Sequence, residues 1–341
     1  MAATILDVAA LAGVSAKTVS RVVNDEPGVS PATRQRVAAA LKRTGYSPDP
    51  AARFLRTGRS DVIGLAVPEL GQPFFAEIAD RIADGARRRG LAVVLGVTGE
   101  AGEAEAEFLA GNPGLDGVIL YWQGLPDRAL AQEARRRPLV LLGENEHDAA
   151  DRVTMDNERG IDLVIAHLAA LGRTRVAALG AGAPGAPIHA AGRARTAAFR
   201  TAMGRHGLEI DERLLVPTVE WRRPDGARAA RELLGRGAPF DAVVAFNDGL
   251  ALGALHELAG AGLRVPDDAA VTGFDNLEAS RYAYPSLTTV SPRLSAYADD
   301  AVEMLVARIA DPTAPVRTIV EDVALLPRDS TIGGGAPWRA G

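Results

Sequence analysis

The segment that most constrains the fold is TILDVAALAGVSAKTVSRVVN, which runs from Thr4 to Asn24. Thr4 and Asp7 have the spacing of a capping box, which begins a helix. Gly13 suits a sharp turn, and Ser15 can cap a second helix directly after it. Two short helices joined by so tight a turn are typical of the helix-turn-helix, whose second helix fits the major groove of DNA.

The spacing of apolar residues assigns a face to each position of these helices. The inward positions should be taken by Val8, Leu11, Ala12, Val19, Val22 and Val23. The second helix would present small and basic residues outward, namely Ala16, Lys17, Ser20 and Arg21. The alternative is an ordinary helical hairpin in which Lys17 and Arg21 are merely solvated.

A third helix is predicted directly after these two. Ser30 can be its N-cap, and Pro31 stands at its first position. The helix should end near Gly45. Its inward residues would be Val37, Ala40 and Leu41. Three short helices form a headpiece of about the smallest size that can hold a core.

The charge of the chain is unevenly distributed. Residues 1–60 carry nine basic and four acidic side chains, a net charge of +5, whereas the whole chain has a net charge of −5. Both lysines of the chain, Lys17 and Lys42, lie in this head. A basic head on an acidic body favours contact with a phosphate backbone through the head alone.

The sequences DVAALAGVSAKTVSRVVN and VSPATRQRVAAALKRTGYSPDPAARFLRTGRS resemble the headpiece and hinge of the lac repressor/gal repressor family of transcription regulators. The resemblance implies a homodimer whose two heads bind the half-sites of a pseudo-palindromic operator in double-stranded DNA. Arg and Lys commonly contact guanine, so base edges should be read by Ala16, Lys17 and Arg21. Phosphate contacts are expected from Ser15, Thr18, Ser20, Asn24, Thr33, Arg34 and Arg53.

Residues 48–60 would connect a headpiece of residues 1–47 to the rest of the chain. Asp49 can cap and Gly58 can end a helix of about two turns, which is too short to be stable alone in water. The segment by itself is compatible with a frayed linker. The resemblance instead implies a hinge helix that enters the minor groove, where Leu55 wedges between base pairs and bends the duplex.

From Asp61 onward, apolar runs alternate with amphipathic segments. Strands are predicted over residues 62–67, 91–95, 117–121, 139–142, 175–179, 214–219, 242–245 and 270–272. Helices are predicted over residues 74–89, 103–109, 158–171, 193–206, 224–234 and 248–259. This order implies an α/β body of two doubly wound, parallel-sheet lobes with a cleft between them, and ligands of such sheets bind beyond the carboxyl ends of the strands.

The body resembles a periplasmic sugar-binding protein placed behind the DNA-binding head. The resemblance is carried by the segments VTMDNERG, AFNDGLALGAL and VPDDAAVTGFDNLEASRYAYPSLTTV. It implies that the chain crosses between the lobes near residues 157–160, 288–291 and 319–322. The expected divisions are a core at 61–333, an N-lobe of about 61–157 and 290–319, a C-lobe of about 158–289 and 320–333, and a flexible tail at 334–341.

The candidates for effector binding are Phe74, Phe75, Trp122, Arg195, Trp221, Asn247 and Asp275. Phe74 and Phe75 are adjacent at a helix N-terminus, where both cannot face the core, so one could stack on a sugar ring or base. Arg195 matches the ligand-clamping arginine of the family, whose guanidinium can hold two hydroxyls or a carboxylate, and Trp221 aligns with its aromatic platform. Core packing and helix capping are the alternatives for individual residues.

Signatures of an enzyme are weak in this chain. The segment GAGAPG at 180–185 has the form GxGxxG after a strand, but Pro184 and Pro187 interrupt the helix that should follow. His256 and Glu257 lack the second histidine of HExxH. With no cysteine and five histidines, neither a metal nor another cofactor is expected. A Rossmann-type enzyme stays open only as an alternative.

The sequence therefore predicts a ligand-responsive, sequence-specific DNA-binding regulator rather than an enzyme. It would be a repressor, released from its operator by a small molecule such as a sugar or related polyol. The alternatives are a solute-binding protein with a vestigial head and a regulator that needs a corepressor. No apolar run reaches the ~18 residues of a membrane helix, and no signal peptide is apparent, so a cytoplasmic protein without a membrane partner is expected.

Overall fold

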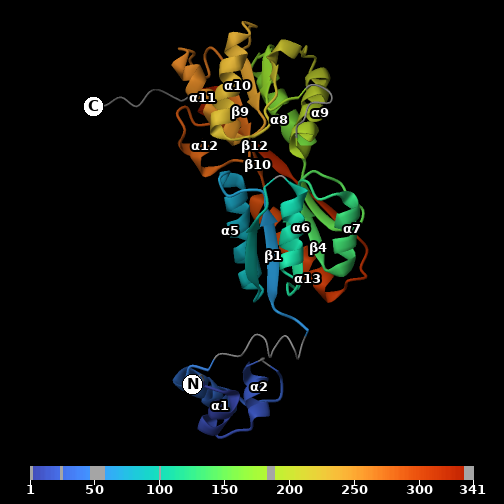
Figure 1. Ribbon diagram of the computed structural model, residues 1–341. Coiled ribbons are helices and arrows are strands. Elements are labelled where there is room, and N and C mark those ends of the chain that lie inside the picture. Colours follow the sequence, from blue (N-terminus) through green and yellow to red (C-terminus); the bar gives the residue numbers. More distant parts are fainter. Residues whose placement is uncertain (1–2, 24–25, 47–57, 100, 183–188, 334–341) are drawn as a thin grey trace, which may run out of the picture. The chain divides into compact units, whose positions relative to one another are not determined.

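The computed structural model describes residues 3–23, 26–46, 58–99, 101–182 and 189–333. The chain forms two compact units, Met1–Asp61 and Val62–Gly341 (Figure 1). The predicted hinge at 48–60 lies outside the described residues up to position 57, as does the predicted tail at 334–341.

The first unit contains the helices α1 (Ile5–Ala12), α2 (Ala16–Val23) and α3 (Pro31–Thr44). The capping box of α1 is confirmed, because the Thr4 amide donates to the Asp7 carboxylate at 2.7 Å while the Thr4 hydroxyl accepts from the Asp7 amide at 3.4 Å. Gly13 ends α1 at φ +64°, a conformation that glycine adopts without strain. Ser15 and Ser30 cap the next two helices through their hydroxyls, as predicted.

The core of the first unit differs from the prediction in helix α1, where Ala9 is buried and Leu11 is not. Its buried residues are Val8, Ala9, Ala12, Val19, Val37 and Ala40. Leu11, predicted to face inward, is 43% exposed. The inward stripe of α1 is centred on Val8, Ala9 and Ala12, and at about 100° per residue Leu11 falls beyond its edge. Val22, Val23 and Leu41 pack against this core but are only partly buried.

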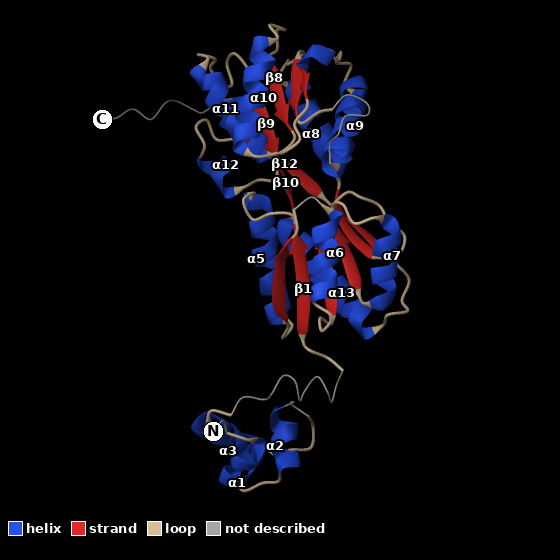
Figure 2. Ribbon diagram, viewed as in Figure 1, coloured by secondary structure: helices blue, strands red, loops and turns tan. Residues whose placement is uncertain are grey.

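The second unit has two lobes, each built on a six-stranded sheet that carries helices on both faces (Figure 2). The first sheet has the order β11-β5-β4-β3-β1-β2. The elements of this lobe are β1 (Val62–Val67), α5 (Pro73–Arg88), β2 (Ala92–Val97), α6 (Gly102–Gly111), β3 (Gly117–Tyr121), α7 (Asp127–Arg136), β4 (Leu139–Leu142), β5 (Asp151–Met155), α13 (Leu294–Ala310) and β11 (Thr318–Glu321). All its strand pairs are parallel.

The second sheet has the order β12-β10-β9-β8-β6-β7, parallel except that β12 runs antiparallel to β10. The elements of this lobe are α8 (Asn157–Ala170), β6 (Val176–Leu179), α9 (Ala190–Arg205), the 3-10 helix η1 (Glu212–Leu214), β7 (Leu215–Val216), α10 (Arg223–Gly235), β8 (Ala242–Ala245), α11 (Asp248–Gly260), β9 (Ala270–Phe274), α12 (Glu278–Tyr282), β10 (Thr288–Pro292), β12 (Val323–Leu326) and α14 (Asp329–Ile332).

The central strands are apolar throughout because both faces of each sheet are covered. On β1, Ile63, Leu65 and Val67 pack into the core beneath α5. Ala66 points to the opposite face and packs with Leu109 of α6. Neighbouring residues of a strand point to opposite faces, so a strand buried on both sides reads as a continuous apolar run.

The chain passes between the two lobes after β5, after β10 and between β11 and β12. The predicted lobe limits need a small correction at the last two crossings. Residues 290–292 belong to β10 in the second sheet, and residues 320–321 belong to β11 in the first sheet. None of the helices within the described ranges combines the length and the apolar character that a membrane crossing demands.

Candidate functional site

A cavity lies between the two lobes and is lined from both of them. All the predicted effector-binding residues line it: Phe74, Phe75, Trp122, Arg195, Trp221, Asn247 and Asp275. Phe74 and Phe75 begin α5 after β1, and Trp122, Asn247 and Asp275 directly follow β3, β8 and β9. Arg195 lies on α9, which follows β6, and Trp221 lies between β7 and α10. The carboxyl ends of parallel strands thus supply the lining, as doubly wound sheets require.

The aromatic part of the lining forms two groups. In the first lobe, the rings of Phe74 and Phe75 pack edge-on at 5.4 Å, and Phe75 packs against Tyr121 at 4.9 Å. In the second lobe, the rings of His189 and Trp221 lie 4.2 Å apart. Phe74 and Phe75 are both buried, so the expectation that only one of them could face the core was wrong: they lie between the core and the cavity.

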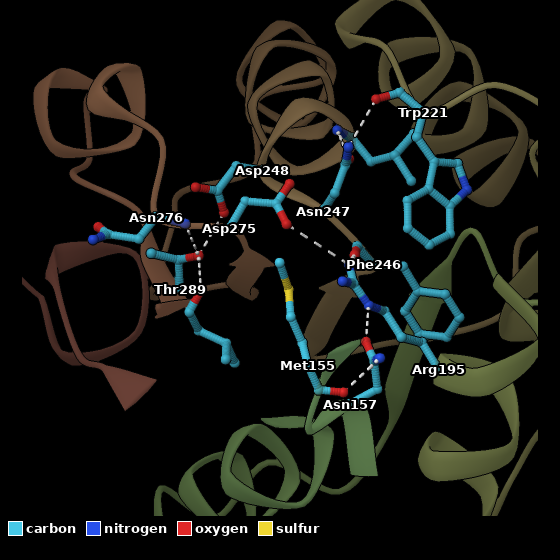
Figure 3. A network of polar contacts seen from close by, with 12 residues as sticks. Met155, Asn157, Arg195, Trp221, Phe246, Asn247, Asp248, Asp275, Asn276 and Thr289 are labelled. Carbon is cyan, nitrogen blue, oxygen red and sulfur yellow. Dashed lines mark hydrogen bonds and ion pairs between the residues drawn. The ribbon is translucent and has the colours of Figure 1, made fainter. Parts of the chain in front are cut away.

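Arg195 on α9 is the centre of a buried polar network (Figure 3). Its Nε donates to Asn157 Oδ1 at 2.7 Å, and its Nη1 donates to the carbonyl of Phe246. Nη1 also lies 4.0 Å from Asp275 Oδ1. The guanidinium stacks over the ring of Phe274 at 3.6 Å. These contacts fix the plane of the guanidinium, so its direction is set before any ligand arrives.

Asp275 stands directly after β9 in a strained conformation, with φ at +119°. Burial, and secondarily the neighbouring carboxylates, hold the pKa of Asp275 well above its usual range, although Arg195 opposes that shift. Asp248 holds the segment that follows Asp275, because its carboxylate accepts from the Leu277 amide at 2.8 Å and from the Ser280 hydroxyl at 2.6 Å. A buried carboxylate thus sets the position of the loop that presents Asp275.

Asn247 is both a helix cap and part of the cavity wall. Its Oδ1 accepts from the Leu250 amide at 2.8 Å at the start of α11, and its Nδ2 donates to the Trp221 carbonyl at 2.9 Å. Helices α10 and α11 approach so closely that a Cβ on Gly226 would lie 2.1 Å from the Leu250 carbonyl oxygen. This close packing, which only glycine permits, brings Trp221 and Asn247 together.

Sequence reasoning missed several residues of the lining. They are Pro68, Glu69, Gln72, Gln123, Glu144, His189, Ala190 and Ala191. Glu69 and Glu144 follow the ends of β1 and β4, which is the same positional signal that identified Asn247 and Asp275. Glu144 accepts from Asn157 Nδ2 at 3.2 Å. Burial, and secondarily Arg195, lower the pKa of His189 to about 4, so this ring is neutral near pH 7.

Trp122 lies on a loop that is anchored by a second buried carboxylate. Its indole Nε1 donates to the Leu125 carbonyl at 2.7 Å. Glu105 of α6 accepts from the backbone amides of Gln123 at 2.7 Å, Gly124 at 3.2 Å and Leu125 at 2.6 Å. Burial raises the pKa of Glu105, and the three amides oppose that shift.

The first unit presents the predicted DNA-reading residues on and beside α2. Lys17 and Arg21 are exposed, as predicted. Ala16 is half-buried against the core of the head rather than fully outward. The Ser15 and Thr18 hydroxyls lie 2.9 Å apart, and Arg34 donates to the Glu26 carbonyl. Of the other residues predicted to contact DNA, Ser20 and Thr33 are half-buried. Asn24, Arg53 and Leu55 lie outside the described residues.

Comparison with known proteins identifies the family. Residues 4–49 match "Bacterial regulatory proteins, lacI family", and residues 165–331 match "Periplasmic binding protein-like domain". The chain is 36% identical over 331 residues to the HTH-type transcriptional regulator CelR of Thermobifida fusca, an alignment that covers 92% of this chain and 94% of CelR. The chain belongs to the lacI family of bacterial regulatory proteins.

Two solved structures of lacI-family proteins are similar over nearly the whole chain. One is a complex of CelR with cellobiose, with 32% identity, a TM-score of 0.71, and coverage of 96% of this chain and 99% of that one. The other is the lac repressor dimer bound to operator and the anti-inducer ONPF, with 27% identity, a TM-score of 0.82, and coverage of 97% and 99%. A helix-turn-helix head followed by two parallel-sheet lobes is therefore the lacI-family architecture, as predicted.

Proposed function

We propose that this protein is a homodimeric transcriptional repressor that leaves a pseudo-palindromic operator when a sugar or related polyol fills the cavity between its lobes. It would act in the cytoplasm, on chromosomal DNA. The observation that carries the proposal is the pairing, in one lacI-family chain, of an exposed basic recognition helix with a cavity whose polar side chains are already fixed in place. Its relatives are named as transcriptional regulators, not as enzymes.

For the head, we assign base reading to Lys17, Arg21 and Ala16. Lys17 and Arg21 can donate to guanine in the major groove, and the small Ala16 permits close approach. We assign phosphate contacts to Ser15, Thr18, Ser20, Asn24, Thr33, Arg34 and Arg53. Leu55 is assigned the minor-groove wedge, which would require the hinge to be folded on DNA.

For the cavity, a polyol is the ligand class that fits the available donors and acceptors. Two of the nitrogens of Arg195 are committed to Asn157 and Phe246, and no hydrogen bond of Nη2 occurs within the described ranges. The carboxylates of Glu144 and Asp275 supply acceptors. The buried Nε1 of Trp221 has no partner in the described part of the chain, a cost that a ligand oxygen could relieve. The aromatic lining suits the apolar faces of a sugar ring.

The coupling between the two sites would be reciprocal. A ligand that bridges the lobes favours one lobe arrangement, and the operator favours another through the paired hinge segments. Thermodynamic linkage then requires ligand and operator to weaken each other's binding by the same factor.

The DNA assignment can be tested with DNA from upstream of the protein's own gene. Fluorescence anisotropy should detect tight, salt-dependent binding to this DNA and much weaker binding to random duplexes. Replacing Lys17 and Arg21 with alanine should abolish the preference for the upstream DNA. The matched control, Lys42→Ala with Arg43→Ala, removes the same charge from exposed positions of α3, so it should retain the preference. Equal loss in both variants would contradict the base-reading assignment.

The effector assignment can be tested by a thermal-shift screen over sugars, nucleosides and purines. A sugar or polyol should raise the melting temperature of the wild-type protein. A screen in which only nucleosides or purines do so would contradict the proposed ligand class.

A further inference from the structure

An ion pair joins the two lobes beside the cavity. Glu69 follows β1 in the first lobe, and Arg222 precedes α10 in the second lobe. The Arg222 Nε and Nη2 atoms lie 3.0 Å and 2.7 Å from the same oxygen of Glu69, Oε2. Both nitrogens of the guanidinium edge therefore bind one carboxylate across the cleft, which holds the two lobes together at this point.

The pair lies at the boundary between two hollows of the cleft. Glu69 lines the cavity described above, whereas Arg222 lines a neighbouring hollow. The two hollows share the walls formed by Gln72, Phe74 and Trp221. If Glu69 and Arg222 separated, the ion pair would no longer divide the two hollows, and Phe74 and Trp221 would face solvent.

Each partner of the pair has a second polar contact on its own lobe. Arg222 Nη1 lies 3.1 Å from Glu220, and Glu69 Oε1 accepts from Gln72 Nε2 at 2.9 Å. If the lobes separate, neither charge is left without a partner. The Arg222 amide is held by Asp225 at 3.1 Å, so the backbone at this point can stay in place while the side chain moves. These alternatives make the pair easy to break and re-form.

The strength of the pair is suited to a reversible contact. The Arg222 side chain is 48% exposed, so water and salt screen its attraction to Glu69. Exposed pairs of this kind shift an equilibrium by up to about fivefold, the equivalent of about 1 kcal/mol. Such a contact biases the lobes towards closure without locking them.

We propose that the Glu69–Arg222 pair is a gate between the lobes: formed, it closes the cleft and covers the aromatic lining of the cavity, and broken, it joins the two hollows and admits a ligand. This goes beyond the proposed function because the gate operates in the ligand-free protein. Its test needs no effector, so a failure of the gate and a failure of the effector assignment are distinguishable.

The gate can be tested by acrylamide quenching of tryptophan fluorescence. Trp122 and Trp221 line the cavity and are 7% and 5% exposed. The other tryptophan of the chain, Trp338, is outside the described residues and is replaced in every sample by Trp338→Phe. Acrylamide is uncharged, so its access reports opening rather than local charge. Glu69→Gln and Arg222→Gln should each raise the quenching constant by up to about fivefold. In the wild-type protein, salt should also raise the quenching constant, because it screens the ion pair, and both variants should lack this salt dependence.

Two further variants decide the interpretation. The exchange of both charges, Glu69→Arg with Arg222→Glu, should return quenching to near the wild-type value. The matched control is Arg213→Gln, which breaks an exposed pair with Asp211 within one lobe, at 2.7 Å, and should leave quenching unchanged. Unchanged quenching in Glu69→Gln and Arg222→Gln would overturn the gate. An equal rise in Arg213→Gln would also overturn it, because the effect would then be general loosening.

Discussion

Arg195 illustrates how a single residue can be both structural and poised for a ligand. Its bonds to Asn157 and Phe246 satisfy part of the guanidinium, and its stacking on Phe274 fixes the plane. A lysine at this position would keep the charge but lose the planar fork and the stacking. The ligand-binding contribution of Arg195 should therefore depend on shape more than on charge.

Arg195→Lys should weaken effector binding by about tenfold or more, since bidentate, stacked contacts are lost. Isothermal titration with a compound found in the thermal-shift screen measures this change. Arg200→Lys is the matched control, because Arg200 lies on the same helix and pairs with exposed Glu212 at 2.6 Å. Effector affinity equal to wild type in Arg195→Lys would contradict the clamp assignment.

Asp248 gives a second residue-scale expectation, for pH. Burial raises its pKa to about 6, against an ordinary value of 3.8. Between pH 3.8 and about pH 6, Asp248 is therefore protonated in the folded state and deprotonated in the unfolded state. Stability from this group is present at low pH and is lost as pH rises through about 6.

Asp248→Asn should remove that pH dependence. From pH 4 to pH 7 the wild type should lose up to about 3 kcal/mol of unfolding free energy relative to the variant, because one pKa unit corresponds to about 1.4 kcal/mol. Urea denaturation of both proteins at several pH values measures the difference, in which the titration of groups that Asp248 does not influence, such as His189, cancels. A difference that stays constant with pH would contradict this role of Asp248.

At the scale of elements, α6 has a specific task. Glu105 in its first turn binds three consecutive backbone amides of the loop after β3, so the helix holds the loop that carries Trp122 and Gln123 to the cavity. The N-terminus of α6 also approaches this loop closely, since a Cβ on Gly102 would lie 2.2 Å from the Gly124 carbonyl oxygen.

Glu105→Ala should leave these buried amides without acceptors and lower the unfolding free energy by about 3 kcal/mol. It should also weaken effector binding, because the Trp122 loop loses its anchor. Urea denaturation and titration with the effector provide the two readouts. Glu107→Ala, at an exposed position of the same helix, is the control and should change neither. An equal loss in Glu107→Ala would mean that the helix as a whole, not the Glu105 carboxylate, is responsible.

Prediction from sequence succeeded where an element had a single dominant pattern. Strands 62–67, 117–121, 139–142 and 242–245 are uninterrupted apolar runs and were predicted to the residue. Strand β5 was missed because its sequence DRVTM begins with two charged residues. Asp151 can be buried there because it pairs with Arg308, and that pair could not be predicted, since Arg308 lies far along the chain. The Arg308 Nη2 and Asp151 Oδ1 atoms are 2.9 Å apart. The strand expected over 214–219 is only Leu215–Val216, since η1 occupies its start and Val219 is exposed.

The site shows the same division. Residues that follow strand ends could be predicted because sheet topology places them at the cleft. Glu105 could not be, because its role depends on a loop that lies 18 to 20 residues further along the chain. His189 gave no signal because its ring meets Trp221, 32 residues further along the chain, only in the folded lobe.

For the whole molecule, two-fold symmetry of the operator requires a dimer. Strand β2 lies at the edge of the first sheet and exposes Val94, Leu95 and Val97, the last at 58%. An exposed apolar edge is a surface that a second copy can cover. We expect this face to contribute to the dimer.

Val97→Lys should therefore shift the protein towards monomer and weaken operator binding, because each monomer would hold only one half-site. Sedimentation velocity at several protein concentrations measures the shift. Leu171→Lys, which places the same charge at an exposed apolar position of the other lobe, should leave the dimer intact. A Val97→Lys variant that remains dimeric at low concentration would place the interface elsewhere.

Occupation of the cavity and binding of the operator are proposed to oppose each other. The most direct test measures both affinities with one effector: operator affinity with and without saturating effector, and effector affinity with and without saturating operator. We expect each ligand to weaken the binding of the other by the same factor, between about 5-fold and 150-fold. Operator affinity that does not change at saturating effector would contradict it.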